Sequence, residues 1–192
     1  MENAIGSASV GDPARFRTLE ELRSGLAGSR GESRGCVALI VRRGHGGRRE
    51  TPDRVLVTFD GGVPGDAWGR HPSPTRDGQI AVMQLDVAEL IANGQPLTLF
   101  GDNLFLDLDL SVGNLPVGSR VRVGSAIVEV TPKPHNGCRK FRARFGDGAL
   151  RFVVTPETRP RNLRGIYLQV VEPGEIVRGD AVEVLSRPQS QA

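Results

Sequence analysis

The stretch SRVRVGSAIVEVT, residues 119–131, decides the fold of this chain. Two short runs rich in valine and isoleucine flank the pair Gly124–Ser125. Apolar and polar residues alternate in both runs, which is typical of strands with one buried face. We therefore expect two antiparallel strands joined by a tight turn.

Further strands are expected on both sides of this hairpin, because the same pattern recurs between turn signals. They comprise CVALIVR (36–42), RVLVTFD (54–60), QIAVMQL (79–85), LRFVV (150–154), RGIYLQVVE (164–172) and AVEVL (181–185). The first two read as a hairpin with a long loop, and NLFLDLDLS (103–111) reads as a half-buried extended segment. Many short strands of this kind predict a β-barrel or β-sandwich core.

Two short helices are expected beside the strands. In TLEELRSGL (18–26), Thr18 and Glu21 have the spacing of a capping box at a helix start. In DVAELIANG (86–94), Asp86 reads as the N-cap and Gly94 follows the last turn. The fold class is thus mainly β with a few short helices.

The composition indicates a soluble globular protein with one compact domain. Of the 192 residues, 38% are hydrophobic and 24% charged, and 25 glycines with 13 prolines favour many turns. We expect a disordered N-terminus (1–14), a short helix and linker (15–35), the β-rich domain (36–186) and a flexible tail (187–192).

The sequence points to the cytoplasm and away from membranes. The N-terminus lacks a signal peptide, and no apolar run is long enough to span a bilayer. Cys36 and Cys138 are too few for a disulfide framework or a zinc site, so we expect reduced thiols. Cys36 opens an apolar strand and reads as a core residue.

Cys138 is the candidate for chemistry. It follows His135 on an expected loop and precedes Arg139 and Lys140. Positive charge favours the thiolate, so we expect a lowered pKa for Cys138. A thiolate binds soft metals, attacks electrophiles or carries sulfur as a persulfide. A half-buried loop cysteine without chemistry fits the residues equally well.

Positive charge is concentrated around this cysteine. Residues 133–164 hold nine basic and two acidic residues, a local charge of +7 that leaves −4 for the rest of a chain whose net charge is +3. Such a cluster binds an anionic small molecule, follows a nucleic-acid backbone, or is simply a solvated face. Nucleic acid ranks last, because stacking aromatics and a recognition helix are missing. Calcium-loop, P-loop, dinucleotide-fingerprint and nucleophile-elbow motifs are missing as well.

Taken together, several motifs resemble those of the MOSC domain, the C-terminal domain of molybdenum cofactor sulfurases. The resemblance covers most of Cys36 to Leu185. Its motifs are, in order, GGVPGDAW (61–68), GDNL (101–104), LPVGSRVRVGSAIVEVT (115–131), PKPHNGCRKF (132–141) and RGIYLQVVEPGEIVRGDAVEVL (164–185). Two departures are His-Asn-Gly-Cys where Arg-x-Pro-Cys is common, and Asp102 where glutamate is usual.

The resemblance implies a MOSC-type β-barrel and a role with the molybdenum cofactor. Cys138 would carry sulfur or ligate molybdenum, and some members of the family reduce N-hydroxylated compounds. The residues that would shape the pocket or face the cofactor are Asp66, Asn103, His135, Arg139, Lys140 and Arg164. No pyridoxal-phosphate sulfurase domain precedes the barrel in this sequence, so sulfur or electrons would come from a partner protein. The alternative is a barrel that binds an anionic ligand or a protein without chemistry.

Overall fold

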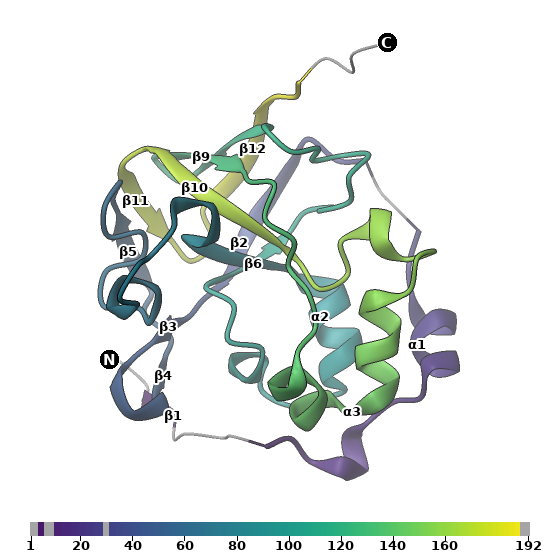
Figure 1. Ribbon diagram of the computed structural model, residues 1–192. Coiled ribbons are helices and arrows are strands. Elements are labelled where there is room, and N and C mark those ends of the chain that lie inside the picture. The colour runs from purple at the N-terminus through teal and green to yellow at the C-terminus, as the bar shows by residue number, and fades with distance from the viewer. Residues whose placement is uncertain (1–3, 6–9, 29–30, 189–192) are drawn as a thin grey trace.

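The computed structural model describes residues 4–5, 10–28 and 31–188, and within them seven strands close into a barrel (Figure 1). Around the barrel the strand order is β10-β6-β7-β2-β12-β8-β9. Only β6 and β7 run parallel, and the other neighbouring pairs are antiparallel. Their bounds are β2 Arg34–Ile40, β6 Ile80–Gln84, β7 Leu104–Asp107, β8 Arg120–Val123, β9 Ala126–Val130, β10 Ile166–Glu172 and β12 Ala181–Ser186. The expected barrel fold is confirmed.

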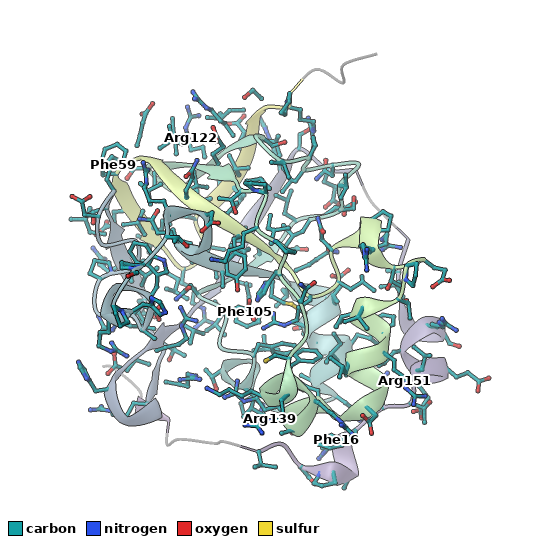
Figure 2. All side chains as sticks on the ribbon, in the orientation of Figure 1. Phe16, Phe59, Phe105, Arg122, Arg139 and Arg151 are labelled. Carbon is teal, nitrogen blue, oxygen red and sulfur yellow. The ribbon has the colours of Figure 1, made fainter. Side chains whose placement is uncertain are left out.

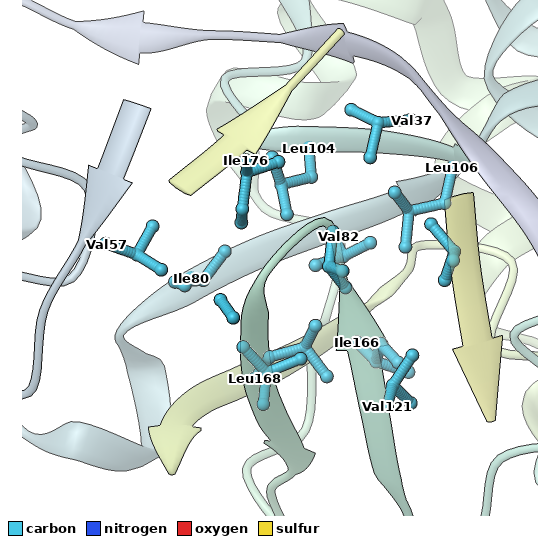
Figure 3. Packing of buried hydrophobic residues seen from close by; sticks show 14 of the residues in the cluster. Val37, Val57, Ile80, Val82, Leu104, Leu106, Val121, Ile166, Leu168 and Ile176 are labelled. Carbon is cyan, nitrogen blue, oxygen red and sulfur yellow. The ribbon is translucent and has the colours of Figure 1, made fainter. Parts of the chain in front are cut away.

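The barrel interior is filled with aliphatic side chains (Figure 3). In β8 and β9 every second residue points inward, so that Val121, Val123 and Val128 are buried while the arginines between them face outward. This alternation is the reason why SRVRVGSAIVEVT predicted its hairpin correctly. The two strands pair through Val121↔Val128 and Val123↔Ala126.

Two small sheets lie beside the barrel. One contains β1 (Ala4–Ile5), β4 (Arg49–Glu50) and β3 (Arg42–Arg43), and the other contains β5 (Arg54–Val57) and β11 (Gly174–Val177). The expected hairpin between 36–42 and 54–60 is therefore wrong. Strand β2 lies between β7 and β12, and β5 pairs with β11 instead. Val55 and Val57 of β5 join the barrel core, so burial and not closeness in sequence selects the partner.

A helical layer covers one side of the barrel (Figure 1). Helix α2 (Leu85–Ala92) packs on β6 and β7, and α1 (Leu19–Gly25) and α3 (Arg139–Val154) lie beside it. A second apolar core fills the junction, and Phe105 of β7 belongs to it together with side chains of the three helices. Phe100 stacks on Phe145 of α3 with ring centroids 4.1 Å apart.

The ends of the first two helices follow the sequence closely. Thr18 and Glu21 form the predicted capping box, in which the Thr18 hydroxyl accepts from the Glu21 amide and the Glu21 carboxylate accepts from the Thr18 amide. Helix α2 begins two residues earlier than expected, since Gln84 is its N-cap and Asp86 lies in the first turn. Asn93, with φ of 47°, ends the helix in the left-handed conformation.

Helix α3 corrects one expectation. Residues 150–154 were predicted as a strand, yet 139–154 are helical. The buried residues Phe141, Phe145, Ala149 and Phe152 are three or four apart, which is helical spacing. The glycines of GDG obscured this pattern, and Gly146, with φ of 86°, does break the helix locally.

Described residues near both ends of the chain make contacts with the rest of the structure. Within the expected disordered segment 1–14, the Gly11 amide donates to the Ala143 carbonyl and Asp12 caps a 3-10 turn. Residues 1–3 and 6–9 lie outside the described residues, as do 29–30 of the expected linker and 189–192 of the expected tail. Arg187 in that tail donates to Asn114. No helix in the described ranges is long and apolar enough to cross a bilayer.

Replacing Phe105 by alanine should lower the free energy of unfolding by about 3–5 kcal/mol, because it leaves a cavity between barrel and helices. Phe59→Ala is the matched control. Phe59 is 43% exposed, so its loss should cost about 1 kcal/mol or less. Urea denaturation monitored by circular dichroism measures both values. Equal losses for the two variants would contradict the assigned junction.

Candidate active site

A cavity of about 790 Å³ opens where the end of the barrel meets α3. Its walls come from the segment after β3, the turn before β7, the 135–138 loop, the start of α3 and the start of β10. We call it the arginine cavity, because five arginines line it: Arg43, Arg49, Arg70, Arg144 and Arg164. Lys140 adds a sixth basic group.

Cys138 lines this cavity and is exposed. It is the N-cap of α3, and its carbonyl accepts from the Arg142 amide at 3.0 Å. Gly137 before it is pressed against α3, since a Cβ there would lie 2.5 Å from Leu150 Cδ1. The glycine thus lets the loop lie flat on the helix and present its cysteine to the cavity.

Two of the arginines are neutralised by buried carboxylates. Arg43 makes a bidentate ion pair with Asp66, and Arg164 donates to Asp102 at 2.8 Å. Burial by itself would raise the pKa of Asp66, but the hydrogen bonds and charge of Arg43 lower it below its usual value. Arg70 donates to the carbonyls of Arg43 and Gly44 and so fixes the β3 turn. These arginines have structural partners of their own.

Arg49 and Arg144 differ from Arg43 and Arg164, since neither is paired with a carboxylate in the described parts of the chain. Within those parts, Arg49 donates only to the nearby carbonyls of Gly47 and Arg48. Burial lowers the pKa of Arg49, and the charges of Arg144 and Arg43 lower it further. Burial also lowers the pKa of Arg144, while the charge of Cys138 acts in the opposite direction. The cavity therefore carries positive charge without internal compensation.

His135 lies deep in the cavity wall as a neutral imidazole. Its side chain is 6% exposed, and its ring lies 4.4 Å from that of Tyr167. Burial lowers the pKa of His135 to about 3 against the opposing charge of Asp102, and the charges of Arg164 and Arg43 lower it as well. Burial also raises the pKa of Tyr167, so its hydroxyl stays protonated at neutral pH.

Buried polar atoms without a hydrogen bond gather at this cavity. In the described residues there are five, and four belong to residues of the cavity or in contact with it. The four atoms are Asp102 Oδ1, His135 Nδ1, Arg144 Nε and Arg164 Nε. Native structures satisfy most buried polar groups, so such a concentration indicates a place for a polar ligand.

Several residues that we predicted for the site meet here. Cys138, His135, Lys140 and Arg164 all line the cavity. Asp66 is 2% exposed and supports the wall through Arg43.

The other two predicted residues lie outside the lining. Asn103 is fully buried and joins strands by accepting from the Ala81 amide and donating to the Val41 carbonyl. Arg139 is exposed at the start of α3 (Figure 2) and is absent from the lining residues.

Sequence reasoning missed the N-terminal half of the site. Arg43, Arg49 and Arg70 were not considered, and Tyr167 was read only as part of a strand. His45 is exposed and also lines the cavity. The signal available was the density of arginine and glycine in RRGHGGRRE (42–50). That density alone does not show which end of the barrel the segment reaches.

Comparison with known proteins identifies the family. The MOSC domain matches residues 81–183, which is more than half of the chain.

The chain belongs to the MOSC domain family.

Solved structures with the same fold include YuaD from Bacillus subtilis and YiiM from Escherichia coli. YuaD is 18% identical with a TM-score of 0.57, and the match covers 81% of this chain and 97% of YuaD. YiiM is 20% identical with a TM-score of 0.51, covering 79% of this chain and 70% of YiiM. At these identities the likeness concerns the fold alone. A search among curated proteins finds no match.

The MOSC match, residues 81–183, includes Cys138, His135 and Arg164 of the cavity. It leaves out Arg43, Arg49 and Arg70, which come from the segment before residue 81. Among the described residues, no group of three or more His, Cys, Asp or Glu could hold a metal ion. The cavity of this MOSC protein thus offers one thiol and many cations.

The buried His135 predicts a pH dependence of stability. Its pKa in the folded protein, about 3, lies below its ordinary value of 6.5, so the unfolded chain binds the extra proton first. The contribution of His135 to the free energy of unfolding is fully present above pH 6.5. It falls by about 1.4 kcal/mol per pH unit as the pH decreases from 6.5 to 3.

Urea unfolding of the wild type and of His135→Gln at pH 7, 6 and 5 measures this slope. The variant should show a shallower loss toward pH 5, because glutamine does not titrate. Identical slopes for both proteins would contradict a neutral, buried His135.

Proposed function

We propose that this MOSC protein binds the molybdenum cofactor in the arginine cavity and uses the Cys138 thiolate to carry sulfur or to ligate molybdenum. One observation carries the proposal: an exposed cysteine and six basic side chains line one cavity with unpartnered buried polar atoms. Family membership adds support, since the MOSC domain is associated with this cofactor.

The residues present fit an anionic cofactor. The cavity volume, about 790 Å³, is within the usual range for small-molecule and cofactor sites. Guanidinium groups bind phosphate through two hydrogen bonds at once, and the cavity holds several of them. The family resemblance implies that Arg139 and Lys140 face the anionic part of the cofactor, and of these two Lys140 lines the cavity, together with Arg164.

The donor set also fits a metal that arrives with ligands of its own. The described residues offer no cluster that could hold a bare ion, whereas Cys138 supplies one soft thiolate ligand. When bound, the cofactor would supply a metal centre for redox chemistry. From the family we propose N-hydroxylated compounds as the substrate class, and their reduction as the reaction.

The chain's own residues would bind the cofactor and orient it. Tyr167 is protonated at neutral pH and can donate a hydrogen bond into the cavity, whereas neutral His135 can accept one at an unprotonated ring nitrogen. Asp66 holds Arg43 in place, and Asn103 ties the strands behind the wall. The exposure of Cys138 leaves it accessible to a sulfur-donor or redox partner protein.

Cofactor content tests the proposal. The wild-type protein, purified from a host that makes the molybdenum cofactor, should contain molybdenum and pterin in comparable amounts. Cys138→Ser should lose most of the molybdenum if the thiolate is a ligand, and Cys36→Ser, the matched control, should keep both components. Mass spectrometry of the metal and fluorescence of the oxidised pterin measure the two contents.

Two outcomes would count against the proposal. If wild type and Cys138→Ser bind neither component even after the cofactor is added, the proposal is wrong. If both bind the cofactor equally and Cys138 carries no sulfur, the protein is a binding module for an anionic ligand and the thiol has no role.

A further inference from the structure

Arg49 and Arg144 meet over Gly101 inside the arginine cavity. A Cβ placed on Gly101 would lie 3.6 Å from Arg49 Nη2 and 3.7 Å from Arg144 Nη1, so the two guanidinium groups approach one point. Arg49 comes from β4 and Arg144 from α3, which are far apart in sequence. We call these two residues the arginine pair. Gly101 itself has φ of 79° and leaves the space above it free of a side chain.

The arginine pair is electrostatically unsatisfied. Arg49 Nη1 is held by the carbonyls of Gly47 and Arg48, which leaves Nη2 directed toward Gly101. Arg144 Nε is buried without a hydrogen bond, and neither residue has a carboxylate partner in the described structure. Burial lowers the pKa of both groups, and in Arg49 the charge of Arg144 adds to this effect. An anion with two charges between them would remove the repulsion and satisfy the free donors.

Cys138 lines the same cavity as the arginine pair and Gly101, and among the described residues it is the one cysteine in that lining. A negative charge on Cys138 would raise the pKa of Arg144. Thiolates react poorly with the central atom of phosphate or sulfate. They do attack a sulfur bonded to another sulfur when the leaving group is a weak base. An oxyanion that carries an outer, sulfane sulfur combines the charge that the pair requires with an atom that Cys138 can attack.

We propose that the arginine pair binds a small dianionic oxyanion bearing a sulfane sulfur, of which thiosulfate is the simplest, and that Cys138 accepts this sulfur. The Cys138 Sγ attacks the outer sulfur, a new S–S bond forms, and the bond to the oxidised sulfur breaks. The electron pair leaves with sulfite, so that thiolate and thiosulfate become persulfide and sulfite. Atoms and charge balance without any further oxidant or reductant. The arginine pair would stabilise the departing sulfite, which keeps both charges.

This inference rests on the sulfur-carrying half of the proposed function and is independent of the cofactor. It names the source of the sulfur as a small oxyanion, in addition to any donor protein. The site also uses Arg49, which lies before the family match at residues 81–183, so the activity would depend on a residue outside that matched segment.

In the test, the full chain is incubated with thiosulfate in the absence of the molybdenum cofactor. Sulfite release is followed by a colorimetric assay, and intact-mass spectrometry detects the gain of one sulfur atom that dithiothreitol reverses. The wild type should release sulfite and gain one sulfur on Cys138. Arg144→Gln and Arg49→Gln should each react about tenfold more slowly or worse at low thiosulfate, because each loses a charged hydrogen bond. Inorganic phosphate should compete with thiosulfate.

Arg151→Gln is the matched control, since Arg151 lies on the same helix and is exposed away from the cavity lining. It should react like the wild type, and Cys138→Ser should neither gain sulfur nor release sulfite. The proposal is overturned if the wild type does not react, if Cys36 gains the sulfur, or if the Arg144 variant matches the Arg151 variant. Thermal melting of every variant verifies that each is folded.

The two proposals fail separately. Sulfur on Cys138 with no cofactor binding would leave this inference standing and refute the cofactor role. Bound cofactor with no reaction toward thiosulfate would refute this inference and leave the cofactor role standing.

Discussion

The buried ion pair between Asp102 and Arg164 is the interaction on which the rest of this structure depends. Asp102 is fully buried at the turn before β7, and Arg164 reaches it from the residues before β10. The same guanidinium lies 5.1 Å from the ring of Phe141 on α3, so one side chain joins two barrel strands and the helical layer. Removing one partner of such a pair leaves a buried charge uncompensated, which typically costs about 3–5 kcal/mol.

The way in which carboxylates are distributed decides the charge of the cavity. Asp102 neutralises Arg164, and Asp66 neutralises Arg43, both in positions shielded from water. No carboxylate pairs with the arginine pair in the described residues, and Lys140 is exposed beside it. The arginines that pair with a carboxylate therefore form part of the cavity wall. The arginine pair, which has no carboxylate partner in the described residues, gives the cavity its positive potential. Cys138 lies in that potential, at the end of a loop that contacts α3 closely because Gly137 has no side chain.

The sequence predicted local structure where pattern and burial agree. The hairpin around Gly124–Ser125 and the capping box of α1 follow from neighbours in the chain, and both are confirmed. The pairing of strands that are distant in the sequence could not be predicted. Strand β5 pairs with β11 and not with β2, because its valines cover the barrel core. Helix α3 was missed since Gly146 interrupts a helical run of phenylalanines.

The site shows the same division between local and long-range information. Cys138 and its neighbours were chosen from local charge, and the family resemblance added Asp66 and Asn103. Arg49 could not be chosen from the sequence, because only the folded chain brings the side-chain ends of Arg49 and Arg144 together over Gly101. A charge count of residues 133–164 also overstated their share of the cavity. Of those nine basic residues, Lys140, Arg144 and Arg164 line it.

The central claim is that Cys138 is accessible and lies in a positive potential. The most direct test compares its alkylation by anionic iodoacetate and by neutral iodoacetamide at pH 7, with glutathione as the reference thiol. The account predicts an iodoacetate-to-iodoacetamide rate ratio above that of glutathione, which declines as added salt screens the arginines. A ratio at or below the glutathione value, unchanged by salt, would contradict it.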